Sequence, residues 1–239
     1  MTLSAAPAFA ELCTKSCFSF LFGASHPEEL VSTAKALGYR ALALTDKNGF
    51  YGMVRAYEEA KKTNFQALYG IEVTIERASV ILIAKNLQGY RLLCRMLSDA
   101  FTRSQQKGVA DFSRFDFQRW VDPKHVHMLL PPRDFPSPSL LNFLREITPL
   151  TQLVTFVHHP DRDFPMKKWM EHLSPEIPRA WTFDAYFHHP LRHEVFEVLQ
   201  AIRSNKPLKE CLPSPNGENY LKSLSALSLV PPEWRYRTM

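Results

Sequence analysis

The sequence predicts an α/β fold built mainly from parallel strand–helix units. Short apolar runs of strand length alternate with segments whose apolar residues recur at helical spacing. Polar residues follow directly after a buried run, as Thr45 and Asp46 do after Tyr39 to Leu44. Because closed barrels and open wound sheets both place their polar side chains at the carboxyl ends of strands, this pattern favours one of these two architectures.

The first unit, residues 11–49, is interpreted as strand, loop, helix and strand. Ser25 is suited to cap the helix, Glu28 completes a capping box, and Pro27 lies in the first turn, where it loses no hydrogen bond. The helix is expected over residues 27–37, because Gly38 is a natural residue for its C-terminal end.

The later elements follow the same rhythm. Helical spacing predicts helices at 53–62, 87–103 and 194–203, and apolar runs predict strands at 66–75, 79–84 and from 151. The helix at 194–203 has an apolar face formed by Val195, Val198, Leu199 and Ile202. His125 and His127 would share one face of a strand, either as a metal pair or, in the favoured interpretation, as solvated side chains at a strand edge.

Composition places the chain among soluble globular proteins. It has 239 residues, 45% of them hydrophobic, with a net charge of +5 and a pI near 9.0, which permits contact with nucleic acid without requiring it. The four cysteines form no CxxC pair, which is typical of free thiols in a reducing compartment. No signal peptide or membrane span is evident, so a cytoplasmic location and no membrane partner are expected.

Several stretches resemble one known family. They include the gap-free run 11–52, with Phe18 to Leu30 and Gly38 to Gly49, and the later runs 68–72, 80–98 and 179–203. They are similar to the PHP domain (polymerase and histidinol phosphatase domain) of bacterial DNA polymerase III alpha subunits. The resemblance is closest to the error-prone paralogue of the SOS mutagenesis cassette, and it is weakest over residues 104–180.

The resemblance covers about residues 9–225. We therefore expect a PHP-like domain over residues 1–225 and a C-terminal tail over residues 226–239. Residues 218–223 are similar to the segment at which the family's PHP domain passes into the polymerase palm, and the sequence ends soon afterwards. No polymerase catalytic domain is therefore expected in this chain.

The resemblance implies a distorted (β/α)7 barrel of the PHP type, similar to a TIM barrel. Active members hold a trinuclear metal cluster at the barrel mouth, where the metal ions activate water and bind phosphate. The family's ligand positions here carry mostly other residues, namely Cys13, Lys15, Phe22, Lys47 and Tyr186. The retained candidates are Glu72 and Asp184, with Asp46 beside them and His159 at a family histidine position.

Three arrangements of this degenerate site are open. In the favoured one, Lys15 and Lys47 form ion pairs with Glu72 and Asp184, and no metal or other cofactor is bound. In the second, the lysines extend to solvent at the barrel mouth. In the third, zinc or manganese binds at a mononuclear site made of Cys13, Glu72, His159 and Asp184.

Three functions follow as hypotheses. The first is a catalytically inactive PHP module that binds an error-prone polymerase subunit, mutasome factors, or DNA beside them, in DNA damage tolerance. The second is a divergent metal-dependent phosphoesterase acting on nucleotides, DNA ends or pyrophosphate. The third is a decayed remnant of a polymerase gene. The Pro-rich connector at 131–138 and the tail Trp234 to Arg237 are the expected contact points, because aromatic and arginine side chains are enriched in interfaces.

Overall fold

The computed structural model describes residues 9–133, 136–154, 177–211 and 217–229. Its strands are β1 (Ala10–Thr14), β2 (Ala41–Lys47), β3 (Gln66–Ile75), β4 (Ala78–Ala84), β5 (Val126–Leu130), β6 (Leu150–Val154) and β7 (Arg179–Trp181). Its helices are α1 (Pro27–Ala36), α2 (Met53–Thr63), α3 (Leu87–Ser104), α4 (Arg114–Trp120), α5 (Pro138–Ile147) and α7 (His193–Ser204). Short 3₁₀ turns are η1 (Pro190–Arg192), η2 (Leu208–Glu210) and η3 (Leu224–Leu229).

The seven strands form one sheet in chain order. β1, β2 and β3 are parallel, β4 is antiparallel to both of its neighbours, and β5, β6 and β7 are parallel again. The segment after β7 returns to β1, where Lys15 N–H donates to Ala185 O at 2.9 Å and Ala185 N–H donates to Cys13 O at 3.0 Å. The sheet is therefore a nearly closed seven-stranded barrel, which confirms the predicted α/β barrel.

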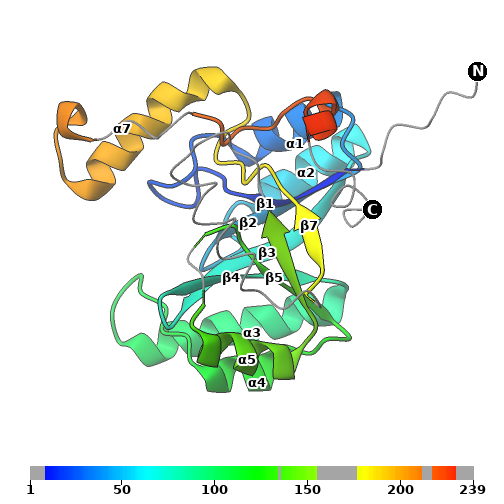
Figure 1. Cartoon of the computed structure of the whole chain (residues 1–239), viewed down its shortest axis with the longest axis vertical. Helices are drawn as coiled ribbons and strands as arrows, with labels where there is room; N and C mark the ends of the chain where they lie inside the picture. The colour runs from blue at the N-terminus through cyan, green and yellow to red at the C-terminus, as the bar shows by residue number, and fades with distance from the viewer. Residues whose placement is uncertain (1–8, 134–135, 155–176, 212–216, 230–239) are drawn as a thin grey trace, which may run out of the picture.

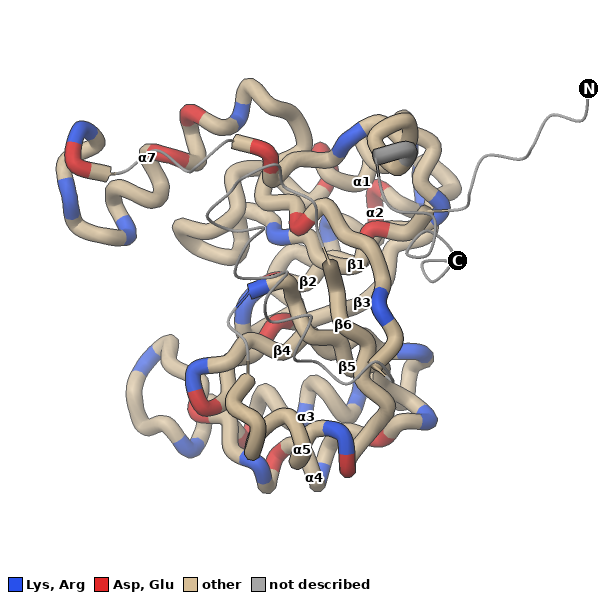
Figure 2. The backbone as a smooth tube through the Cα atoms, viewed as in Figure 1, with Lys and Arg blue, Asp and Glu red and all other residues tan. Residues whose placement is uncertain are grey.

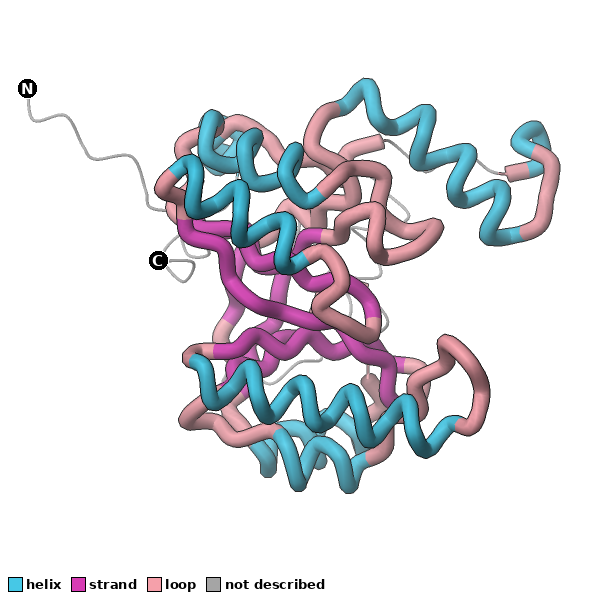
Figure 3. The backbone as a smooth tube through the Cα atoms, turned by 180° about the vertical axis from the view of Figure 1, so that it is seen from behind, coloured by secondary structure: helices cyan, strands magenta, loops and turns pink. Residues whose placement is uncertain are grey.

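Helices cover the barrel on two opposite sides. α1 and α2 lie on one side, α3, α4 and α5 lie on the other, and α7 projects away from the strands (Figure 1). The view from behind shows the same two helical layers with the strands between them (Figure 3). No helix in the described ranges is long and apolar enough to cross a membrane.

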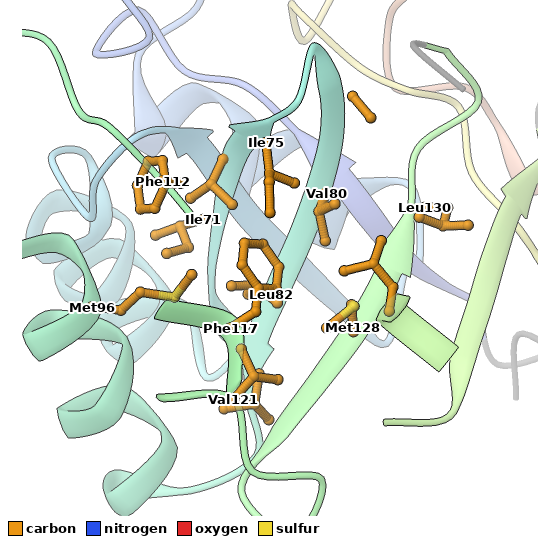
Figure 4. Packing of buried hydrophobic residues seen from close by; sticks show 14 of the residues in the cluster. Ile71, Ile75, Val80, Leu82, Met96, Phe112, Phe117, Val121, Met128 and Leu130 are labelled. Atoms are coloured by element: carbon orange, nitrogen blue, oxygen red, sulfur yellow. The ribbon is translucent and has the colours of Figure 1, made fainter. Parts of the chain in front are cut away.

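Each helical layer has its own hydrophobic core against the outer face of the barrel. The larger core joins β3, β4 and β5 to α3, α4 and α5, with Phe117 at 0% exposure between Leu82 and Val121 (Figure 4). A second core packs α1 and α2 against β1 and β2, around residues such as Leu30 and Leu42. Burial of these faces follows from the helical spacing of the apolar residues, which is why the predicted helices are observed.

The start of α1 differs from the prediction by one residue. The N-cap residue is His26, whose N–H donates to Glu29 Oε2 at 2.8 Å. Ser25, the predicted cap, is buried, and its Oγ instead accepts the N–H of His188 at 2.9 Å. Glu28 forms a surface ion pair with α2 rather than closing a capping box. Ser25 is suited to the cap by its local sequence, but its contact with the distant His188 leaves the cap position to His26.

A buried carboxyl group joins the two edges of the barrel. Glu11 on β1 accepts hydrogen bonds from Cys13 N–H at 2.9 Å, from Phe183 N–H at 2.8 Å and from the hydroxyl of Thr182. Its burial raises the pKa of Glu11 from 4.5 to about 7, although these hydrogen bonds act in the opposite direction. The folded chain therefore holds a proton on Glu11 at a pH where the unfolded chain has lost it.

Glu11 is expected to make the protein less stable as the pH rises from about 5 to about 8. Between the unfolded and folded pKa values the folded state binds more protons, so the free energy of unfolding falls with pH, in total by roughly 3 kcal/mol. Urea unfolding at both pH values measures this change. It should be much smaller in Glu11→Gln and unaltered in Glu58→Gln, which lies exposed on α2. An equal pH dependence in wild type and Glu11→Gln would contradict the assignment.

Candidate functional site

The site at the barrel mouth continues the inward-facing rows of the strands. The barrel interior is filled by Cys13, Ala43, Ile81, Ile83, Leu129, Leu153 and Ala180. Successive side chains of a strand alternate between its two faces, so steps of two residues stay on the inward face. Such steps lead out of the interior to Lys15, Thr45, Lys47, Arg133, Asp184 and Tyr186. Figure 2 shows that a few charged positions lie among the strands, between the two helical layers.

Glu72 of β3 is the centre of this site. Its side chain is 1% exposed, and Oε2 lies 2.9 Å from Nζ of Lys15, which is 0% exposed. Oε1 lies 3.1 Å from Nζ of Lys47. Lys15 also donates to Oγ1 of Thr45 at 2.9 Å, so its ammonium group is held from two strands. The predicted ion pairing of both lysines is therefore found, but both pair with Glu72 and neither pairs with Asp184.

The ion-pair partner of Asp184 is Arg133, which follows β5. Its guanidinium group contacts Glu72 Oε2 at 2.5 Å and also forms an ion pair with Asp184 Oδ1. The same group lies 3.8 and 3.9 Å from Cys13 Sγ and stands 5.5 Å from the centre of the Tyr186 ring. One planar cation thus bridges the two retained carboxylates, with Nη2 on Glu72 and Nη1 on Asp184.

Phe22 covers the outer side of the site. Its ring centre lies 4.4 Å from Nζ of Lys47 and 4.2 Å from Cζ of Arg203 on α7. A cation over an aromatic face is attracted by the ring quadrupole. Phe22 therefore contributes to holding Lys47 at the mouth, although it cannot bind a metal ion.

The electrostatics of the site favour charged carboxylates and ammonium groups together. Burial alone would raise the pKa of Glu72, but Arg133, Lys15 and Lys47 outweigh it and hold the pKa well below its ordinary value. Burial would lower the pKa of Lys15, but the ionised carboxylate of Glu72 beside it acts in the opposite direction, and the pKa is raised. Glu72 and Lys15 are therefore both ionised over the whole neutral range.

The two neutral members of the site are a thiol and a phenol. Burial raises the pKa of the Cys13 thiol well above its ordinary value, so Sγ–H is a donor and lies 3.1 Å from Asp184 Oδ1. Burial likewise raises the pKa of Tyr186 well above its ordinary value. Neither side chain supplies the anion that metal binding through sulfur or a phenolate needs.

Asp46 does not belong to the mouth. It follows Leu42 and Leu44 on the opposite row of β2, so it faces away from the barrel interior. Its Oδ1 accepts Ser16 N–H at 2.8 Å and Ser19 Oγ–H at 2.7 Å, and its Oδ2 accepts Ser16 Oγ–H at 2.8 Å. Asp46 therefore fixes the loop after β1, and its predicted position beside Glu72 and Asp184 is wrong.

The residues present do not fit a metal cluster. In the described ranges, no three side chains of His, Cys, Asp or Glu are grouped so that they could hold a metal ion. Cys13 and Asp184 touch, but the Arg133 guanidinium group lies between them and Glu72. A divalent ion there would meet the cationic groups of Arg133 and Lys15. At about 4 Å, two unit charges repel by roughly 4 kcal/mol at an effective dielectric constant of 20.

Other predicted features lie elsewhere. His159 and the tail Trp234 to Arg237 fall outside the described residues. The connector at 131–138 is exposed only in part of its described length: Ser137 and Pro138 are exposed, whereas Pro131 and Pro136 are buried and Arg133 points into the mouth. His127 is exposed on β5, and His125 precedes this strand, where its Nδ1 lies 3.1 Å from Asn86 Nδ2.

The relatives found by sequence comparison are error-prone DNA polymerases. The chain is 33% identical over 232 residues to the error-prone DNA polymerase of Pseudomonas aeruginosa, which covers 95% of this chain and 22% of that protein. It is 34% identical over 244 residues to that of Dechloromonas aromatica, covering 98% and 24%. An Anaeromyxobacter error-prone DNA polymerase is 49% identical over 104 residues, covering 41% and 9%. The chain thus spans less than a quarter of the length of these relatives.

The fold and the sequence agree on the family. An amidohydrolase structure from Chromobacterium violaceum superposes with a TM-score of 0.52 at 16% identity, covering 75% of this chain and 88% of that one, which shows a shared fold. Residues 11–130, half of the chain, match the PHP domain family, and they include β1 to β5. The barrel and the match together show that the chain belongs to the PHP domain family and is homologous to error-prone DNA polymerases.

Proposed function

We propose that this chain is a PHP-domain protein without phosphoesterase activity, and that it serves as a binding module for an error-prone DNA polymerase in DNA damage tolerance. The observation that carries the proposal is the network of Glu72, Arg133 and Asp184. Arg133 occupies the space between the carboxylates that a metal ion would need, and Lys15 neutralises what remains of Glu72. Metal-assisted hydrolysis requires a metal-bound water, and these residues provide no place to hold one.

Metal content and hydrolysis test the catalytic half of the proposal. Purified protein incubated with zinc or manganese and then desalted is expected to retain far less than one ion per chain by elemental analysis. It is also expected to hydrolyse p-nitrophenyl phosphate and pyrophosphate no faster than Asp184→Asn. Stoichiometric metal together with hydrolysis that is lost in Asp184→Asn would instead establish the divergent phosphoesterase.

The binding half rests on an apolar stripe of α7. Three residues of its predicted apolar face are open to solvent, since Val195 is 42%, Val198 45% and Ile202 58% exposed. These residues follow at three and four positions, so they form one continuous stripe on a helix that projects from the barrel (Figure 1). A stripe of this kind is the pattern with which a helix docks into a partner's groove. The match covers 22% of the Pseudomonas aeruginosa polymerase, and the partner that we propose is the rest of such a polymerase.

Capture from the native cell tests this partner. Tagged protein is expected to recover an error-prone polymerase or its accessory factors, more strongly after DNA damage. Val198→Asp with Ile202→Asp should abolish capture, because a carboxylate would be desolvated in the interface. Val109→Asp, an equally exposed apolar position in the loop after α3, serves as the control and should keep it. Recovery of no polymerase component under either condition would refute the partner role.

A further inference from the structure

A groove runs along the outside of the barrel between α2 and α3. It exists because β3 passes to β4 through the two-residue turn Glu76 and Arg77, both with positive φ, instead of through a helix. The first half of β3, residues 66–69, is consequently only partly covered and lines the groove, whereas Ile71, Val73 and Ile75 farther along the strand are buried. This groove lies outside the mouth, and none of its residues takes part in the proposed function.

Aromatic side chains form much of the groove's lining. Its main part has a volume of about 580 Å³ and is lined by Phe50, Tyr57, Tyr69 and Tyr90 among others. A smaller hollow of about 330 Å³ shares Tyr57 and Tyr69 and extends it along α2. The Tyr90 ring packs 4.9 Å from Phe50 and 5.6 Å from Tyr69, centre to centre, so these rings are held in place without a ligand. Tyr57 remains 48% exposed.

The charge of the groove is positive. Lys85 lines its main part, Lys61 lines its extension, and none of the lining residues that the structure describes is acidic. Arg91 is exposed on α3 one turn after Leu87, which lines the groove. Cationic side chains therefore flank the groove on both sides, Lys61 on α2 and Lys85 and Arg91 on the α3 side, with aromatic rings between them.

We infer that this groove binds single-stranded nucleic acid. Aromatic rings stack on the faces of unpaired bases regardless of sequence, and lysine and arginine neutralise the phosphates on either side. A duplex hides the base faces, so it could use only the cations. An apolar peptide would gain nothing from Lys61, Lys85 and Arg91. The combination of rings and cations therefore selects a single strand.

Fluorescence anisotropy with a labelled oligothymidine of about 16 nucleotides tests this inference on the full chain. Binding should weaken as salt increases, with a slope of about two in log affinity against log salt if three phosphates are neutralised. Tyr57→Ala should weaken binding about tenfold. Lys61→Glu with Arg91→Glu should weaken it further. Lys206→Glu with Lys209→Glu, the same charge change after α7, is the control and should change it little.

Several results would overturn the inference. They are absence of binding at low salt, equal loss of binding in the two charge-reversed variants, or a duplex bound as tightly as the single strand. Circular dichroism and thermal melting confirm that each variant is folded. Polymerase capture by the groove variants separates this inference from the proposed function: they should still capture the polymerase, whereas the α7 variants should still bind oligothymidine.

Discussion

Replacing Glu72 with glutamine is expected to lower the free energy of unfolding by about 3–5 kcal/mol. The substitution keeps the size of the side chain but removes the charge that Lys15, Lys47 and Arg133 all face. Lys15 is fully buried, so its ammonium group would be left without an ionised partner in a low-dielectric site. Urea unfolding at neutral pH measures the loss.

The surface pair of Glu76 and Arg114 supplies a matched control. Its shortest contact is 2.6 Å, but its side chains are 39% and 44% exposed, so Glu76→Gln should cost far less stability than Glu72→Gln. The two variants should also differ in acid. Because the pKa of Glu72 is lowered on folding, its stabilisation is present above about 4.5 and is lost as the pH falls toward the folded pKa. Equal losses of unfolding free energy in Glu72→Gln and Glu76→Gln would contradict the central role of Glu72 in the ionic network.

Arg133→Met is expected to cost about 3 kcal/mol, because Asp184 would keep only the Cys13 thiol as a partner among the contacts described here. Methionine retains the apolar stem, so the loss reports the guanidinium group. Arg133→Lys should recover only part of it, since one ammonium group cannot reach both carboxylates with the geometry of a planar fork. Thermal melting and urea unfolding of both variants check this order.

Arg114→Met is the corresponding surface control and should be close to neutral. If Arg133→Lys proved as stable as wild type, a single contact would suffice and the bridging role would be wrong. A further readout is metal binding. Lys15 and Lys47 still pair with Glu72 once the guanidinium group is removed, so Arg133→Met should show no zinc-dependent rise in melting temperature, as is expected of the wild type.

The barrel was largely predictable from sequence because apolar period and helix ends are local signals. The helices at 53–62, 87–103 and 194–203 are observed with boundaries shifted by no more than one residue. The predicted cap of α1 was wrong because Ser25 Oγ instead accepts a hydrogen bond from His188 N–H, more than 160 residues away. Capping preferences depend on neighbouring residues in the sequence, so they cannot predict a contact with such a distant segment.

The site was predictable at positions where the family resemblance marks a metal ligand. Lys15, Lys47 and Glu72 were assigned to one ionic network, and they form it. Arg133 was missed because its Pro-rich surroundings indicated an exposed connector. A usable signal existed, since Arg133 lies four residues after the inward-facing Leu129 and so falls on the same row. The same count would have excluded Asp46, which lies on the other row.

The seam between β1 and the segment after β7 has a consequence for how the chain folds. Every other strand pairs with its neighbour in sequence, whereas this seam joins Cys13 to Asp184 across 171 residues. Contacts so distant carry the largest loop-closure entropy and form late in folding, when the rest of the ring already holds the ends together. The seam should therefore open first: amide exchange at Ala185 and Phe183 should be faster than in β3 and β4, although both segments are equally buried.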